Sequence, residues 1–266
     1  MKRKKVTTEL GTIDYAVRKG NKLIVFLNGF GSFDTEQIFT PIIRELPEEV
    51  GIFAPDYLNS GFSERSLKDY TLSDEAAKLA EIINTFNAKE VIIVAHSIGG
   101  VYAFQMQRKV KNLSTLISIE PTTREIILNP PQNIEYLQKQ KEVKNVEEKI
   151  RRDIVKNFTE KEAQEFWKVT EENSKKFDQN ALINAQNSFE KDVFLKEDGS
   201  LNTNITSIII TEKYRQREYK RSEYFSKNLN NKIITLGSYH YLQLEHPKEI
   251  ANIIEKVIKT NNKIIY

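Results

Sequence analysis

Short apolar runs alternate with helical periodicity over the first 120 residues of the chain. The runs with the length of strands are residues 6–10, 13–17, 23–27, 52–54, 91–95 and 116–119. The first two flank Gly11 and predict a hairpin. Between later runs, apolar residues recur every three or four positions at 38–46 and 76–86, the second group behind a T-x-x-D cap at Thr71 and Asp74. Strands that alternate with helices predict a mostly parallel, doubly wound α/β sheet.

The alternation stops between residues 121 and 204, where no strand pattern is visible. One helical face in this stretch carries Val143, Val146, Ile150, Ile154 and Phe158. Thr159 and Glu162 predict the start of a further helix toward Phe166 and Trp167. We therefore expect an inserted helical cap.

Beyond the insertion the alternation resumes, with a strand at 205–211, a helix to about residue 229, a strand at 233–236 and a last helix at 247–259. A chain of 266 residues suits one large α/β domain with an insertion better than two independent domains. The predicted core comprises residues 1–120 and 205–266, and the predicted cap comprises residues 121–204.

Charge is balanced along the chain. There are 40 basic and 37 acidic residues, for a net charge of +3, so no general field favours nucleic acid or an anionic membrane as a partner. No apolar run is long enough to span a bilayer. The start M-K-R-K-K is followed by polar residues rather than by the apolar segment of a secretory signal. We expect a cytoplasmic protein without a signal peptide.

The residues that most often bind metals are scarce. The absence of cysteine excludes disulfides, a cysteine nucleophile and thiolate metal sites together. Only three histidines are present, His96, His240 and His246, and none lies in an H-E-x-x-H pattern. We expect neither a metal nor another cofactor.

A basic stretch interleaved with tyrosines superficially suits single-stranded nucleic acid. Its members are Lys213, Arg215, Arg217, Lys220 and Arg221, with Tyr214, Tyr219 and Tyr224 between or after them. Three glutamates, Glu212, Glu218 and Glu223, reduce the net charge of the stretch to +2. Its position between two strands predicts a surface helix, so we expect no nucleic-acid partner.

The most informative segment is residues 91–100, V-I-I-V-A-H-S-I-G-G. A buried strand leads directly into Ser97, and two glycines allow a helix to begin at once. Such a sharp turn needs small residues two positions before and after the serine, where Ala95 and Gly99 stand. The N–H groups at the start of the helix would face the same spot as the hydroxyl. A phosphate-binding turn would need G-x-x-x-x-G-K-[ST] or G-x-G-x-x-G, and neither follows this strand.

This segment resembles the nucleophile elbow of the α/β-hydrolase family, G-x-S-x-G, with Ala95 in place of the first glycine. The resemblance implies the α/β-hydrolase fold, with Ser97 as the nucleophile. It also implies the chain order serine, acid, histidine.

The resemblance implies a histidine base in the loop after the last strand. His240 lies there, in G-S-Y-H, ahead of a helix that begins with a proline. His96 is adjacent to Ser97 and must point elsewhere from the turn. His246 precedes Pro247 and remains an alternative.

Two carboxylates between Ser97 and His240 could orient the base. Glu120 follows the strand at 116–119, a known alternative position for the acid in the family. Glu212 follows the strand at 205–211, the commoner position, but alignment with the family pattern G-x-x-D places Tyr214 where the aspartate belongs. This departure favours Glu120, while Glu212 and a dyad without an acid stay open.

The resemblance also implies two backbone donors for an oxyanion. The N–H of Ile98, after the serine, is one. The N–H of Phe30 is the other, in a loop N-G-F-G that is similar to the family's H-G-x-G, with Asn28 in place of the histidine. Residues 56–63 resemble the structural loop D-x-x-G-x-G-x-S, with Asn59 at the first glycine, where a left-handed backbone is expected.

Together these residues predict a serine hydrolase that cleaves a small-molecule carboxylic ester or related acyl substrate through an acyl-enzyme intermediate. A lyase or acyltransferase with the same triad, or a weakly catalytic ligand receptor of the same fold, remains an alternative. A haloalkane dehalogenase is disfavoured because it needs an aspartate at position 97. Phe166, Trp167 and Phe189 could line the cap, but such residues more often form its core, so none is given a role.

Overall fold

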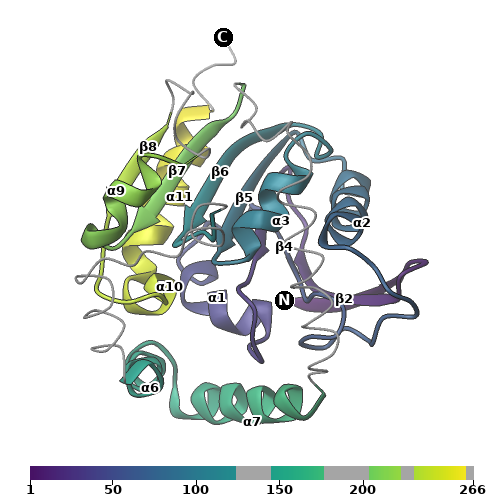
Figure 1. The fold of residues 1–266 in the computed structure, drawn as a ribbon, viewed down its shortest axis with the longest axis horizontal. Coiled ribbons are helices and arrows are strands. Elements are labelled where there is room, and N and C mark those ends of the chain that lie inside the picture. The colour runs from purple at the N-terminus through teal and green to yellow at the C-terminus, as the bar shows by residue number, and fades with distance from the viewer. Residues whose placement is uncertain (124–144, 177–203, 223–230, 262–266) are drawn as a thin grey trace.

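The computed structural model describes residues 1–123, 145–176, 204–222 and 231–261 (Figure 1). These residues form an eight-stranded sheet in the order β1-β2-β4-β3-β5-β6-β7-β8. The strands are β1 (Lys2–Thr7), β2 (Thr12–Arg18), β3 (Lys22–Leu27), β4 (Gly51–Pro55), β5 (Glu90–His96), β6 (Leu113–Ile119), β7 (Thr206–Thr211) and β8 (Lys232–Thr235). Neighbours from β4 to β8 are parallel, whereas β2 is antiparallel to both β1 and β4.

Helices cover both faces of the sheet, which confirms the predicted doubly wound architecture. They are α1 (Thr35–Ile43), α2 (Leu72–Thr85), α3 (Gly99–Met106), α9 (Gln216–Tyr219), α10 (Leu242–Glu245) and α11 (Pro247–Asn261). Two more, α6 (Val146–Asn157) and α7 (Glu160–Lys176), lie between β6 and β7 in the chain. No helix in these described ranges is both long enough and apolar enough to cross a bilayer.

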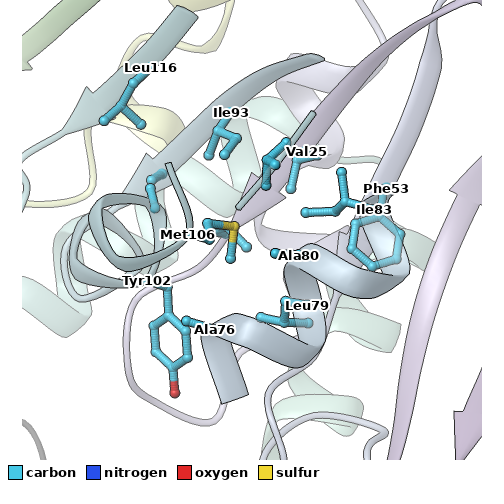
Figure 2. Packing of buried hydrophobic residues seen from close by; sticks show 14 of the residues in the cluster. Val25, Phe53, Ala76, Leu79, Ala80, Ile83, Ile93, Tyr102, Met106 and Leu116 are labelled. Atoms are coloured by element: carbon cyan, nitrogen blue, oxygen red, sulfur yellow. The ribbon is translucent and has the colours of Figure 1, made fainter. Parts of the chain in front are cut away.

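One face of the sheet packs against α2 and α3 (Figure 2). Successive strand residues point to opposite faces, so Val25 and Ile93 face these helices while their chain neighbours face away. Leu79 and Met106 fill the space above them and are fully buried. Burial of each such large apolar side chain contributes about 1.5–3 kcal/mol, which fixes α3 and therefore the turn that precedes it.

The opposite face packs against α1 and α11. Ile24 and Phe26 of β3 meet Ile38 and Phe39 of α1, and the Phe26 and Phe39 ring centroids are 4.9 Å apart. Ile254 of α11 completes this layer and is fully buried. The two layers together hold the carboxyl ends of the parallel strands at one edge.

The helices α6 and α7 lie beyond α1 and α10 at one end of the molecule (Figure 1). Phe166 is fully buried and packs against Phe33, Phe158 and Trp167. The capping box of Thr159 and Glu162 is present at the start of α7. The boundaries of the cap at residues 121–204 stay a prediction, and Val143 and Phe189 lie outside the described residues.

Three details differ from the prediction. The first strand covers Lys2–Thr7 rather than residues 6–10, because Thr8 and Gly11 already form the turn through paired backbone hydrogen bonds. Lysines are tolerated in this strand because it is at the sheet edge and largely exposed. The helix α10 was not expected at all.

The third difference concerns the basic stretch. It is not one surface helix: a 3₁₀ turn η2 (Lys213–Arg215) leads into the short α9, and residues 223–230 lie outside the described part. Arg215 is 8% exposed, because its guanidinium is drawn inward by a buried carboxylate.

Candidate active site

Ser97 lies in a strained turn between β5 and α3. Its φ is +53°, a left-handed value that is uncommon outside glycine. The backbone around it is well held: its N–H donates to the Ile119 carbonyl at 3.0 Å, and its own carbonyl accepts from Gly100 and Thr122, each at 3.0 Å. The side chain is half-buried. The turn has the backbone conformation that a nucleophile elbow requires.

Close approach of the backbones explains the small residues around this turn. A Cβ atom at Gly99 would lie 2.5 Å from the carbonyl oxygen of Leu27, at the end of the neighbouring strand β3. A Cβ atom at Gly29 would lie 3.2 Å from the Cβ of Ser97. The loop after β3 therefore lies directly against the turn, as the sequence predicts.

The two candidate oxyanion donors are available in this arrangement. Within the described residues, the backbone N–H groups of Phe30 and Ile98 donate no hydrogen bond. Asn28 supports the loop that carries Phe30: its side chain accepts from Gly29 N–H at 2.7 Å and donates to the Phe33 carbonyl at 3.1 Å. The asparagine thus braces the loop on which the predicted donor depends.

His96 contacts the backbone of His240. Its Nε2 lies 3.0 Å from the His240 carbonyl oxygen, and because a carbonyl can only accept, Nε2 carries the proton. Burial and the neighbouring His240 hold the pKa of His96 well below its usual value, so the ring is neutral. Through this contact, His96 supports the loop that carries His240, the candidate base.

His240 lies in the loop after β8, with its side chain 38% exposed. Its Nδ1 is 3.8 Å from Oε2 of Glu120. This is an ion-pair distance, longer than a hydrogen bond, and contacts of this kind commonly tighten when substrate binds. His246 instead places Nδ1 3.2 Å from Glu249, on the exposed side of α11. The geometry favours His240 as the base.

Glu120 directly follows β6, also with a left-handed backbone, φ +46°. Its Oε1 accepts from the Thr211 hydroxyl at 2.5 Å and from the Glu212 N–H at 2.7 Å. Its Oε2 contacts the guanidinium of Arg215 as well as facing His240. Burial acts to raise the pKa of Glu120, but the Arg215 charge and the interactions with His240 lower it to about 2. Glu120 is therefore a buried carboxylate beside His240 that is ionised at neutral pH.

Glu212 contributes its backbone to this cluster, since its N–H is one of the donors to Glu120. The structure thus brings Glu120 rather than Glu212 into ion-pair distance of His240. Arg215 is the member of this cluster that sequence reasoning missed. Its only sequence signal was a place in a charged stretch, which is typical of solvent-exposed helices.

A groove of about 610 Å³ lies between α6, α7 and the loop after β3. Phe33, Val146, Ile150 and Trp167 form its apolar lining. Trp167 therefore lines this groove, and Phe166 is fully buried in the core. Phe189 lies outside the described part. In that part of the chain, no three His, Asp or Glu side chains are grouped so that they could hold a metal ion.

Comparison with protein-family models matches residues 24–253 to the alpha/beta hydrolase family. Among solved structures, the chain is similar to Smu.1393c from Streptococcus mutans, with 27% identity, a TM-score of 0.80 and 97% coverage of each chain. It is also similar in fold to the N-acyl homoserine lactonase AidH, with 14% identity, a TM-score of 0.68 and 97% coverage of each chain.

Among curated proteins, the chain is similar to Rv2715 of Mycobacterium tuberculosis, with 26% identity over 107 residues. This match covers 39% of the chain and 30% of the mycobacterial protein. The matched part of the chain thus spans under a third of that relative's length.

Proposed function

This chain belongs to the alpha/beta hydrolase family, and we propose that it is a serine hydrolase that cleaves a carboxylic ester or related acyl substrate. One observation carries the proposal: His240 Nδ1 lies 3.8 Å from a carboxylate oxygen of Glu120, and Ser97, Glu120 and His240 each follow the carboxyl end of a parallel strand, β5, β6 and β8 in that order. This is the order and arrangement of a nucleophile, a base and an orienting acid.

In the first half of the proposed reaction, Ser97 Oγ attacks the acyl carbon while His240 Nε2 takes the hydroxyl proton. Nδ1 of His240 faces Glu120, whose charge stabilises the imidazolium that forms. The N–H groups of Phe30 and Ile98 bind the oxyanion of the tetrahedral intermediate. The carbon–oxygen bond to the leaving group then breaks, and His240 gives its proton to the departing oxygen.

In the second half, a water molecule attacks the acyl-enzyme. His240 takes a proton from the water, and the bond between the acyl carbon and Ser97 Oγ breaks. The proton returns to Ser97, and the carboxylic acid leaves. The protein's own side chains supply every proton transfer that the cycle needs.

The chemistry of serine argues for an acyl substrate. Attack of Ser97 on a saturated carbon would leave an ether, which water and a histidine base do not cleave. Attack on a carbonyl leaves an ester, which water and a histidine base do cleave. A lactone is an ester closed into a ring, so the similarity in fold to a lactonase is compatible with this substrate class.

A series of p-nitrophenyl esters of increasing chain length tests the proposal. We expect turnover by the wild-type protein, and Ser97→Ala should lower kcat by roughly 10³-fold or more. Ser118→Ala is a matched control, because that hydroxyl is buried in the neighbouring strand β6.

Turnover that persists in Ser97→Ala would contradict the proposal. Binding of esters without turnover would indicate a receptor. Transfer of the acyl group to an added alcohol in preference to water would indicate an acyltransferase.

A further inference from the structure

We infer that Arg215 is a positioning residue for the candidate acid: it fixes the Glu120 carboxylate and sets the charge that faces His240, and so extends activity to lower pH. This inference rests on the proposed function. Its basis is the way in which a single oxygen of Glu120 is shared between two partners, Arg215 and His240.

The guanidinium of Arg215 is held on several sides. It contacts Glu120 through Nη1, and it donates to Glu218 from Nε at 3.2 Å and from Nη2 at 3.1 Å. Its Cζ lies 4.8 Å above the centroid of the Tyr219 ring, and the Tyr219 hydroxyl donates to the Pro121 carbonyl at 2.9 Å. With its side chain 9% exposed, the arginine has little freedom to leave the carboxylate.

The two carboxylate oxygens of Glu120 have different partners. Oε1 is occupied by Thr211 and the Glu212 N–H. Oε2 is the oxygen that faces His240 at 3.8 Å, and the same oxygen contacts Arg215. Arg215 therefore neutralises the part of the carboxylate on which His240 depends, in a buried place where charge is weakly screened.

Removal of the arginine charge leaves Glu120 either ionised or protonated, and both outcomes move the pH dependence of activity in the same direction. If Glu120 remains ionised, its full charge faces His240 and stabilises the imidazolium, so the base holds its proton up to a higher pH. If Glu120 instead takes up a proton, the base loses its orienting charge until a higher pH is reached. Either way, the acid limb of the pH–rate profile moves upward.

Other groups around the pair are compatible with this assignment. His96 approaches from β5 and is neutral, and burial raises the pKa of Tyr219 well above its usual value, so it is neutral too. Among the described residues, Glu218 in α9 is a further carboxyl group that contacts Arg215, at 3.1 Å, and Glu212 follows β7. Arg215 is thus the cation in contact with Glu120 among the described residues.

The test compares three variants by the pH dependence of ester turnover. Arg215→Gln removes the charge but keeps a hydrogen-bond donor, Arg215→Lys keeps the charge but loses the planar fork, and Arg217→Gln removes an exposed charge two residues away. In Arg215→Gln, we expect the acid limb of kcat/KM to move up by about one pH unit, with KM little changed. In Arg215→Lys, the limb should stay near its wild-type position while kcat falls several-fold. Arg217→Gln should match wild type.

An acid limb that stays in place in folded Arg215→Gln would overturn the inference, as would a shift of equal size in Arg217→Gln. If Arg215→Gln does not fold, as thermal melting reports, unchanged kcat in Arg215→Lys would also overturn it. Labelling of Ser97 by a fluorophosphonate distinguishes failure of this inference from failure of the proposed function. Wild-type protein that is labelled and active retains the proposed function whatever Arg215 does, whereas unlabelled, inactive protein overturns both.

Discussion

A buried carboxylate helps a histidine only if it keeps its charge, and the neighbours of Glu120 ensure that it does. Hydrogen bonds from Thr211 and the Glu212 N–H, together with Arg215, offset the cost of burial. The Arg215 charge, the interactions with His240 and the Thr211 hydrogen bond together outweigh desolvation and hold the pKa of Glu120 at about 2. At neutral pH Glu120 is therefore ionised and can serve as the acid.

The choice between the two glutamates can be tested with conservative variants. Glu120→Gln removes the charge beside His240 and should lower kcat by about 10²- to 10⁴-fold. Glu212→Gln keeps the backbone N–H that donates to Glu120, so kcat should stay within a few-fold of wild type. Ester turnover of the two purified variants measures the difference.

Full activity in Glu120→Gln would reject this assignment. A loss confined to Glu212→Gln would move the acid to the end of β7.

Most of the candidate site could be predicted from the sequence, because Ser97, Ile98 and Phe30 each follow a strand with an uninterrupted apolar run. Parallel strands bring their carboxyl ends to one edge, so the loops had to meet. Arg215 could not be predicted. Its partner Glu120 is 95 positions away in the sequence, and Arg215 stands among polar and charged residues such as those of an exposed helix.

At the scale of elements, α6 is joined to the loop that carries His240. The hydroxyl of Tyr239, the residue before His240, donates to Asp153 of α6 at 2.7 Å, and both side chains are buried. Asn157 at the end of α6 donates to the Leu244 carbonyl at 2.7 Å. A helix of the predicted cap thus helps to place the candidate base.

Tyr239→Phe tests this link. It leaves an oxygen of buried Asp153 without its partner, so the free energy of unfolding should fall by about 1–3 kcal/mol. Because the His240 loop loses an anchor, kcat should fall more than KM rises. Denaturant unfolding and ester kinetics provide the two measurements.

Arg152→Gln is the control, since it removes the other, solvent-exposed partner of Asp153. Its effects should be smaller than those of Tyr239→Phe, because the Arg152 side chain is 59% exposed and water can take its place beside Asp153. Equal effects of the two variants would contradict a role for the tyrosine hydroxyl.

The elements themselves were largely predictable, with exceptions at the ends. The box of Thr71 and Asp74 caps α2 as expected, and Asn59 adopts the predicted left-handed backbone, with φ +64°. The edge strand β1 was misplaced because its residues are mostly charged and carry no apolar period. Its pairing with β2, not its own pattern, makes it a strand.

Across the whole molecule, Arg3 ties the edge strand to the core. It donates to Asp14 at 2.7 Å, to Asp34 at 2.8 Å and to Asp56 at 2.7 Å. Asp34 caps α1 and Asp56 begins the structural loop after β4, so one cation joins three elements. The basic start of the chain therefore has a structural task that its composition does not show.

A second buried carboxyl makes stability depend on pH. Burial raises the pKa of Glu75 to about 7, although the Tyr102 hydroxyl and the Leu58 N–H, each at 2.6 Å, act to lower it. The folded state therefore favours the protonated form. This preference stabilises the fold fully below the usual pKa of 4.5. As the pH rises toward 7 the stabilisation is lost, and the free energy of unfolding falls by about 3 kcal/mol.

Glu75→Gln should remove this dependence. Its Tm relative to wild type should rise as pH increases from about 5 to about 8, because the amide never ionises. Glu81→Gln, on the exposed side of the same helix, is the control. Parallel Tm curves for Glu75→Gln and wild type across this range would show that Glu75 does not titrate as described.

The central claim is that Ser97 is an activated nucleophile, and covalent labelling tests it most directly. Wild-type protein is treated with a fluorophosphonate, its intact mass is measured, and the modified peptide is sequenced. We predict a single adduct on Ser97 and none in Ser97→Ala. The absence of an adduct on folded wild-type protein, or an adduct that persists in Ser97→Ala, would contradict the account.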